Sequence, residues 1–334
     1  MNKNIKRKMS LGLTLLLALA LLVTGCSMPG GSKSGGSGGG GAKVMYVSPT
    51  PDDFKILLSN ALADSAAEAG VTLELGEPCA TVDEQVAQIE RAVNEGFDAI
   101  ICLPVDRATC LQLEVSAGDL PIIFVNSMPD KEYLEKDKYM CVGSYEMDAG
   151  RYQAEYVWNK LGNPSTLNLV ILRGELTHNA SIQRSVSVKD YFKENGVAVN
   201  YVFDDTANWD TTEAGDVFSL FLKTNQPYDA VICNNDSMAL GVCDVMRSRG
   251  IDMSKIPVCG VDATVDGCKS IVDGEMQFTV YQSATGQGAA AIDTVKRLVN
   301  NGTAEGVEGL AEDGIYVWVP FEKVDASNVK NYMK

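Results

Sequence analysis

The chain has 334 residues, of which 46% are apolar and 22% charged, and this is the composition of a globular protein large enough for two domains. The net charge of −16 repels phosphate backbones, so nucleic acid is not expected as a partner. His178 is the only histidine, which excludes catalytic or metal sites that need two imidazoles.

The amino-terminal residues have the pattern of an export signal. Positive charges within residues 3–8 precede an apolar stretch at residues 11–23 that is too short to span a bilayer comfortably. The segment Val23-Thr24-Gly25-Cys26 resembles a bacterial lipobox. This resemblance implies cleavage after residue 25 and a lipid on Cys26 that anchors the mature protein to the outer face of a membrane. An ordinary secretory signal or an uncleaved anchor is the alternative. Residues 26–42, rich in Gly and Ser, are expected to form a flexible tether.

The cysteines beyond the signal are expected to be buried thiols rather than metal ligands. None of them forms a C-x-x-C pair, and several lie within apolar, strand-like runs. The sequence therefore predicts no bound metal and no cofactor. These cysteines are Cys79, Cys102, Cys110, Cys141, Cys233, Cys243, Cys259 and Cys268.

From residue 43 onward, short apolar runs alternate with helical patterns, which is typical of a parallel sheet covered on both faces. The first series predicts strands at 44–47, 71–75, 99–103 and 121–125 and helices at 54–69, 82–93 and 108–117. The second predicts helices at 149–161, 180–195, 211–223 and near 238–246, and strands at 167–172, 197–203, 230–233 and 256–259. The fold class is therefore α/β, with two doubly wound lobes side by side and a cleft between them.

Polar side chains follow the strands of both series at the points where the strands end. In an open α/β sheet these ends form the edge at which ligands bind. In the stretch from Tyr228 to Asp262, for example, one apolar run stops at Asn234-Asn235-Asp236 and the next at Gly260-Val261-Asp262. The candidates found in this way are Asp52, Asp53, Phe54, Asn126, His178, Arg184, Trp209, Asn235, Asp262 and Gln282.

The chemistry of these candidates fits a carbohydrate. Amides, carboxylates and a guanidinium can each make two hydrogen bonds to neighbouring hydroxyls, while Phe54 and Trp209 offer flat apolar faces. A pyranose has hydroxyls around its rim and C–H groups on both faces, so it needs both kinds of partner. Within the central stretch, Asp236 is expected to cap the following helix and Asn235 to bind the ligand. For Asp262 a helix cap is the alternative.

The segments VICNNDSMALG (231–241), GVDA (260–263), NWD (208–210) and FVN (124–126) together resemble the type I periplasmic sugar-binding proteins, most closely their galactose/glucose-binding branch. The resemblance covers about residues 43–334. It implies two lobes that are joined by a three-strand hinge, close over one sugar and deliver it to an ABC permease. The implied hinge crossings lie near 143–145, 282–283 and 316–320, which gives lobes of 43–143 plus 283–315 and of 144–282 plus 316–334.

The resemblance also implies a role for each candidate. Phe54 and Trp209 would sandwich the sugar ring. Asp52 would bind hydroxyls, with Asp53 as the alternative because the turn between them is hard to align. The remaining ligand contacts would come from Asn126, His178, Arg184, Asn235, Asp262 and Gln282.

Three features depart from the galactose/glucose pattern. Ala180 stands where that branch has a carboxylate, so a sugar hydroxyl left unpaired would cost roughly 1–3 kcal/mol unless Asn179 or a water replaces the acceptor. Gln282 stands where the glucose branch has asparagine and the pentose branch glutamine. Residues 162–166 lack the carboxylates of the calcium loop that close relatives carry, so no calcium is predicted there.

The expected function is capture of a monosaccharide, with a galactose/glucose-type hexose favoured, by a lipid-anchored monomer that serves an ABC permease. The alternatives are a sugar-sensing subunit for chemotaxis or a membrane kinase, and a binder of a pentose or another small carbohydrate. A repressor of related fold would begin with a basic helix-turn-helix, and a hydrolase would need a nucleophile or metal motif. The chain shows neither pattern, so no enzymatic activity is expected.

Overall fold

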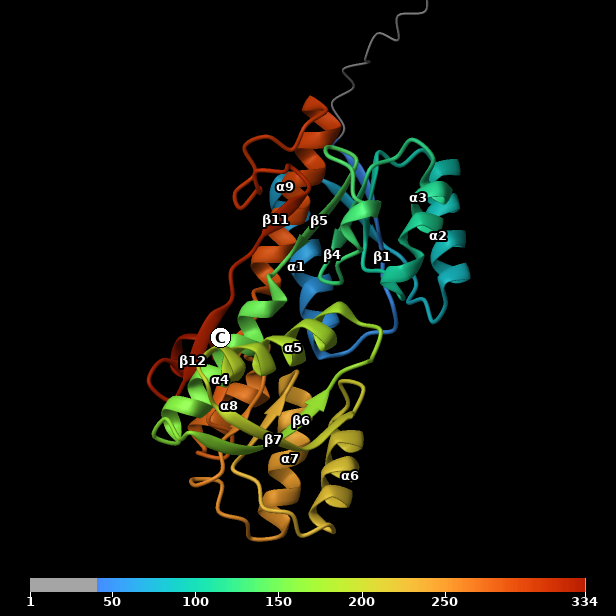
Figure 1. The fold of residues 1–334 in the computed structure, drawn as a ribbon. Helices are drawn as coiled ribbons and strands as arrows, with labels where there is room; N and C mark the ends of the chain where they lie inside the picture. Colours follow the sequence, from blue (N-terminus) through green and yellow to red (C-terminus); the bar gives the residue numbers. More distant parts are fainter. Residues whose placement is uncertain (1–40, 334) are drawn as a thin grey trace, which may run out of the picture. The chain divides into compact units, whose positions relative to one another are not determined.

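The computed structural model describes residues 41–333. The predicted signal segment, the predicted lipid attachment site at Cys26 and nearly all of the predicted tether lie outside these residues. From Gly41 on, the chain forms one compact unit that contains two six-stranded sheets (Figure 1). Each sheet is covered by helices on both faces and forms one lobe, which confirms the predicted α/β class with two doubly wound lobes.

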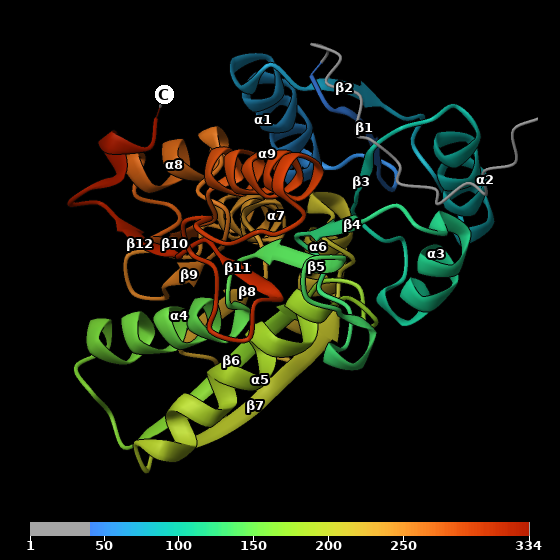
Figure 2. The same cartoon turned by 90° about the horizontal axis from the view of Figure 1, so that it is seen from above.

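The first lobe is built on an all-parallel sheet with the strand order β11-β5-β4-β3-β1-β2. Helices α1 and α9 lie on one face of this sheet, and α2 and α3 lie on the other (Figure 2). The strands are β1 (Lys43–Val47), β2 (Thr72–Leu75), β3 (Ala99–Cys102), β4 (Ile122–Val125), β5 (Tyr139–Gly143) and β11 (Tyr316–Trp318). The helices are α1 (Asp53–Ala69), α2 (Val82–Asn94), α3 (Cys110–Ala117) and α9 (Ala284–Asn301), with short 3-10 turns at Arg107–Thr109 and Lys131–Tyr133.

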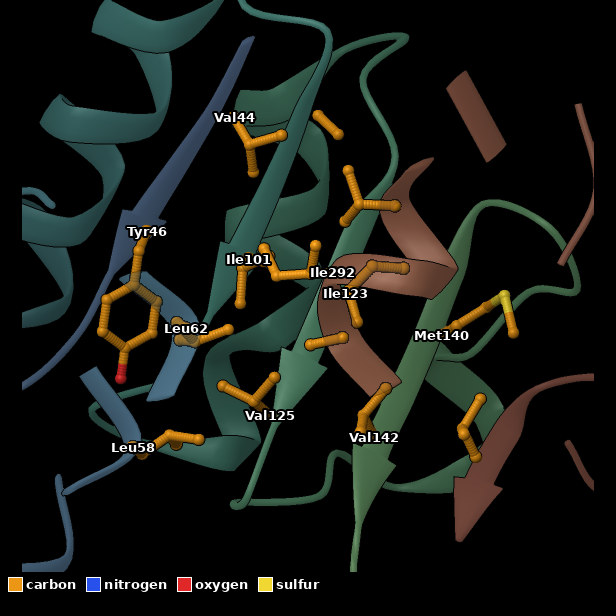
Figure 3. Packing of buried hydrophobic residues seen from close by; sticks show 14 of the residues in the cluster. Val44, Tyr46, Leu58, Leu62, Ile101, Ile123, Val125, Met140, Val142 and Ile292 are labelled. Atoms are coloured by element: carbon orange, nitrogen blue, oxygen red, sulfur yellow. The ribbon is translucent and has the colours of Figure 1, made fainter. Parts of the chain in front are cut away.

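The alternation of side chains along the strands explains the two apolar layers of this lobe. In β1, Val44 and Tyr46 point to the face covered by α1 and α9, whereas Met45 and Val47 point to the face covered by α2 and α3. All four side chains are at most 2% exposed. Figure 3 shows the first layer, in which Ile292 of α9 packs among the strand residues.

The second lobe repeats the arrangement with the strand order β12-β10-β9-β8-β6-β7. All its pairs are parallel except β10 with β12, which are antiparallel. The strands are β6 (Thr166–Arg173), β7 (Ala198–Thr206), β8 (Ala230–Cys233), β9 (Val258–Cys259), β10 (Phe278–Tyr281) and β12 (Glu322–Asp325). The helices are α4 (Glu146–Lys160), α5 (Asn179–Glu194), α6 (Thr211–Leu222), α7 (Asp236–Ser248) and α8 (Val265–Val272), with a 3-10 turn at Val329–Asn331.

The chain crosses between the lobes three times, between β5 and α4, between β10 and α9, and between β11 and β12. The first and third crossings are hydrogen-bonded, since the Val319 N–H donates to the Gly143 carbonyl over 2.9 Å. The predicted lobe boundary at residue 316 was too early, because β11 pairs with β5 and so belongs to the first lobe. The third crossing is therefore the short segment from Val319 to Phe321. The apolar run of β11 gives no sequence signal for which sheet it joins.

Helix α4 begins at Glu146, before the predicted start at residue 149. Its first turn carries Glu146 and Asp148, and a prediction based on apolar periodicity does not detect a polar first turn. The difference matters because it places Glu146 within a helix that starts directly at a hinge crossing.

The eight cysteines of the described residues are all buried, as predicted, and none of them forms a disulfide within these residues. Burial raises the pKa of the Cys102 and Cys110 thiols above the ordinary value. Between residues 41 and 333, no helix has both the length and the apolarity needed to cross a membrane.

Candidate functional site

All nine predicted ligand-binding residues line one pocket between the two lobes. The pocket encloses about 450 Å³ of space that is not filled by protein atoms, part of it open to solvent. Asp53, Lys55 and Ala180 also line it. The nine predicted residues are Asp52, Phe54, Asn126, His178, Arg184, Trp209, Asn235, Asp262 and Gln282.

The first turn of α1 forms the first-lobe wall of the pocket. Asp52 is the N-cap of α1, and its Oδ1 accepts a hydrogen bond from the Lys55 N–H over 2.9 Å. Its Oδ2 lies 2.9 Å from the Lys55 ammonium, so Asp52 already has protein partners. Phe54 is only 8% exposed and joins the pocket to the lobe core. Sequence reasoning missed Lys55, although its spacing of three residues from Asp52 is that of a helical ion pair.

Asp53 reaches across the pocket to the second lobe. Its Oδ2 accepts a hydrogen bond from the Ser237 hydroxyl, in the first turn of α7, over 2.7 Å. Asp53, treated in the sequence as the alternative to Asp52, thus joins the two lobes and lines the pocket with it.

Asn126 follows β4 and has a φ of 62°, a left-handed conformation that asparagine adopts more readily than most residues. Its backbone N–H donates to the Val142 carbonyl, which fixes the turn at the strand end. Its side-chain amide makes no hydrogen bond to another residue of the range 41–333. The amide is therefore free to bind a ligand in the pocket.

Asp262 presents a carboxylate with no protein hydrogen-bond partner within the described part of the chain. The residue is 7% exposed and has a φ of 115°, and its backbone N–H donates to the Val280 carbonyl. Burial raises the pKa of Asp262 well above its ordinary value, while the nearby Arg184 guanidinium opposes this shift. A buried acceptor without a donor is the group that ligand hydroxyls would satisfy.

Asn235, and not Asp236, caps helix α7, so the prediction that Asp236 is the cap was wrong. The Asn235 Oδ1 accepts from the Met238 N–H over 3.0 Å, and its Nδ2 donates to the Trp209 carbonyl over 3.2 Å. Asp236 is the first helical residue, and its fully buried carboxylate accepts three hydrogen bonds instead. The donors are the Thr264 N–H, the Thr264 hydroxyl and the Thr279 hydroxyl, at 2.8, 3.2 and 2.6 Å.

These bonds let Asp236 hold the loop that carries Asp262. Two consecutive loop residues, Asp262 and Ala263, have positive φ values, which is a strained arrangement for residues with side chains. The Ala263 N–H donates to the hydroxyl of Thr279, which in turn donates to Asp236. Burial raises the pKa of Asp236 to about 7 despite these donors.

Trp209 and His178 lie edge to face on the second-lobe side, with ring centroids 5.3 Å apart. Trp209 occupies this position only because residue 174 is glycine, since a Cβ there would lie 2.1 Å from the indole ring. The His178 Nδ1 accepts from the Ala180 N–H over 3.2 Å, so the ring proton of a neutral imidazole sits on Nε2. His178 can therefore donate one hydrogen bond to a ligand.

Burial, together with the positive charges of Arg184 and Lys55, lowers the pKa of His178 from 6.5 to about 3. We expect the imidazole to stay neutral from about pH 8 to about pH 5. Because the unfolded chain binds a proton near pH 6.5, His178 should reduce stability as the pH falls from there toward 3. Proton NMR of an untagged protein would show this directly, since the chain has one histidine. A His178 signal that titrates near pH 6.5 in the folded protein would contradict the assignment.

Arg184 lies at the centre of the second-lobe wall and is 3% exposed. Its Nε donates to the Glu146 carboxylate over 2.6 Å, its Nη1 to the Asn234 carbonyl over 2.6 Å and its Nη2 to the Gln282 Oε1 over 3.2 Å. Glu146 was not predicted as part of the site. Local sequence gives no signal for it, because its partner is 38 residues away and only the fold brings the pair together.

Two parallel-sheet lobes that share one polar pocket define a two-lobe ligand-binding protein. The family model for the periplasmic binding protein domain matches residues 44–304, and the chain belongs to this family. It is an ABC transporter solute-binding protein for a sugar or polyol, of a family of extracytoplasmic binding proteins rather than enzymes.

Relatives with different ligands resemble the chain along most of its length. A putative rhizopine-binding protein of Rhizobium meliloti is 30% identical over 84% of this chain and 89% of its own. A D-galactose/methyl-galactoside binding periplasmic protein of Haemophilus influenzae is 25% identical over 85% of this chain and 89% of its own. An ABC transporter solute-binding protein of Bacillus halodurans, solved with bound myo-inositol, is 29% identical and has a TM-score of 0.78. The match covers 89% of this chain and 99% of that protein.

Proposed function

We propose that this protein captures one six-membered-ring sugar, of the galactose/glucose type, by closure of the hinge and hands it to an ABC permease. A lipid on Cys26 would hold it outside the membrane. The observation that carries this proposal is the composition of the pocket wall. Aromatic rings from opposite lobes, Phe54 and Trp209, line the same space as the Asp262 carboxylate and the Asn126 amide. Neither of these two polar groups has a hydrogen-bond partner among residues 41–333.

This arrangement suits a ring with polar edges and apolar faces. Stacking of C–H faces on the two rings would orient the ligand, and the rim hydroxyls would supply the donors that Asp262 lacks. His178 and Arg184 would donate to ligand oxygens from the second lobe. Because the contacts come from both lobes, the complete set forms only when the lobes are together, so binding favours closure.

A cyclic polyol such as myo-inositol is the second candidate. Ala180 lines the pocket and offers no acceptor at the position where the galactose/glucose pattern has a carboxylate. Asn179 does not line the pocket, and its Nδ2 is buried without a partner within the described residues. The relative with bound myo-inositol adds weight to this candidate.

A ligand screen would test the proposal and separate the candidates. The unit that begins at Gly41 would be melted with D-galactose, D-glucose, myo-inositol, D-ribose and glycerol, and each responder would be measured by calorimetry. A ligand that binds only the folded state stabilises it by about 2.7 kcal/mol at a concentration of 100 Kd. A response to galactose or glucose supports the first candidate, and one to myo-inositol alone supports the second. A response to ribose alone, or to no compound, would contradict the proposal.

Trp209→Ala should weaken binding of the responding compound by roughly 1–3 kcal/mol, because one apolar face of the ring would lose its partner. Stability should fall less than for a fully buried tryptophan, since the half-buried indole lines the pocket and packs only against the edge of the second-lobe core. Trp209→Phe keeps a ring and should lose less affinity. Equal affinities of the wild type and both variants in calorimetry would exclude the stacking role.

A further inference from the structure

Each of the three hinge crossings supplies one contact to the Arg184 side chain. Glu146 follows the first crossing directly, Gln282 is the residue after β10 at the second, and Phe321 lies at the third. Glu146 and Gln282 accept hydrogen bonds from the guanidinium, and the Phe321 ring centroid lies 5.8 Å from the guanidinium carbon. On the ligand side, the Trp209 ring centroid lies 5.9 Å from the same carbon. Arg184 therefore connects the pocket to every strand of the hinge.

Glu146 is the partner that fixes the plane of this guanidinium. The pair is buried, with 0% of the Glu146 and 3% of the Arg184 side chain exposed. Arginine has five N–H donors in one plane, and Glu146, Asn234 and Gln282 accept one each. Two donors remain on the two terminal nitrogens. The direction of both donors therefore depends on the orientation of this plane.

We propose that Glu146 is a positioning residue that sets the direction of the two free Arg184 donors and couples their use by a ligand to the hinge. The identity of the ligand rests on the proposed function, whereas the positioning of Arg184 rests on its contacts with Glu146, Asn234 and Gln282. Glu146 touches Arg184 at the point where the chain leaves the first lobe, so a change in the crossing angle moves the carboxylate and hence the guanidinium. In return, a ligand bound to Arg184 favours the crossing geometry that keeps the pair intact.

The test compares two changes at Glu146 with a matched change on the same helix. Glu146→Gln keeps the shape and an acceptor but removes the charge, whereas Glu146→Ala removes the contact. Glu155→Gln is the control, because Glu155 also lies on α4 and pairs with Lys323 at the surface, where 38% and 45% of the two side chains are exposed. Circular dichroism would establish that each variant folds. Should Glu146→Ala not fold, Glu146→Gln still provides the comparison.

The first measurement needs no ligand. In nitrogen-15 NMR, the Arg184 Nε–H, identified by its absence in Arg184→Lys, should give a sharp and slowly exchanging signal in the wild type and in Glu155→Gln. The signal should be lost or exchange rapidly in Glu146→Ala and be intermediate in Glu146→Gln. An unchanged Arg184 signal in every folded Glu146 variant would overturn the inference, whatever the protein binds.

The second measurement titrates D-galactose and myo-inositol and follows ligand-induced compaction by small-angle scattering. Glu146→Ala should bind the responding compound roughly 10- to 100-fold more weakly and compact less, while Glu155→Gln behaves like the wild type. A lower melting temperature with unchanged affinity and compaction would mean a structural role alone and would overturn the inference. If the wild type binds neither compound, the proposed sugar function fails, and the Arg184 signal alone decides the positioning role.

Discussion

Asp262→Asn is expected to weaken binding of the responding sugar or polyol roughly 100-fold or more, the largest effect on affinity that we predict. Hydrogen bonds to a charged group contribute about 1.5–3 kcal/mol each, and the Asp262 carboxylate can accept two or more from a ligand. Asparagine has the same shape and tolerates positive φ, so the loop with its φ of 115° should persist.

The same change should stabilise the empty protein. Because burial raises the Asp262 pKa, ionisation costs folding free energy in the ligand-free state, and this cost grows as the pH rises above the ordinary value of 3.8. Melting temperatures without ligand at about pH 8 would test the predicted gain in stability, and calorimetric titrations would test the predicted loss of affinity. The control is Asp266→Asn, an exposed position four residues further on that does not line the ligand pocket. If Asp262→Asn binds the ligand as tightly as the wild type, the Asp262 carboxylate does not bind the ligand.

Asp236→Asn is expected to change how stability depends on pH. The folded-state pKa of Asp236 is raised from 3.8 to about 7, so the folded protein binds a proton more tightly than the unfolded chain. The stabilisation by Asp236 is therefore fully present below pH 3.8 and is lost as the pH rises through about 7. Relative to the variant, the wild type should lose on the order of 2–3 kcal/mol between about pH 5 and about pH 8.

Urea unfolding at several pH values would measure this difference, because effects of other groups cancel between wild type and variant. Two parallel curves of unfolding free energy against pH would contradict the assignment. Asp236→Asn should also weaken ligand binding, since the loop of Asp262 and Ala263 depends on Asp236 through Thr264 and Thr279.

The sequence was sufficient to predict the chemistry of the pocket wall, because parallel strands bring their carboxyl ends to one edge. Residues as far apart as Asp52 and Gln282 could be assigned to one site from this rule and a family resemblance. The rule does not say which side chains are already occupied by protein partners. Asp52 is paired with Lys55, whereas Asp262 has no partner in the described residues, and only the fold distinguishes them.

The errors have the same physical origin. Asn235 and Asp236 are both good helix caps, and the choice between them depends on Thr264 and Thr279, which are distant in sequence. Glu146 lies near a predicted hinge crossing and was left without a role, because its distant partner cannot be identified from the local sequence. Its burial against Arg184 is a property of the packed α4 and α5 pair. Tertiary partners, rather than local propensity, decide these positions.

The eight shielded thiols have a consequence for how such a protein survives export. Disulfide exchange requires a thiolate that can reach an oxidant. In the folded protein, burial raises the thiol pKa and also keeps oxidants away from the sulfur atoms. Cross-linking and mispairing are then hazards only for the interval between translocation and folding. Rapid folding, rather than a set of native disulfides, would protect this fold outside the cell.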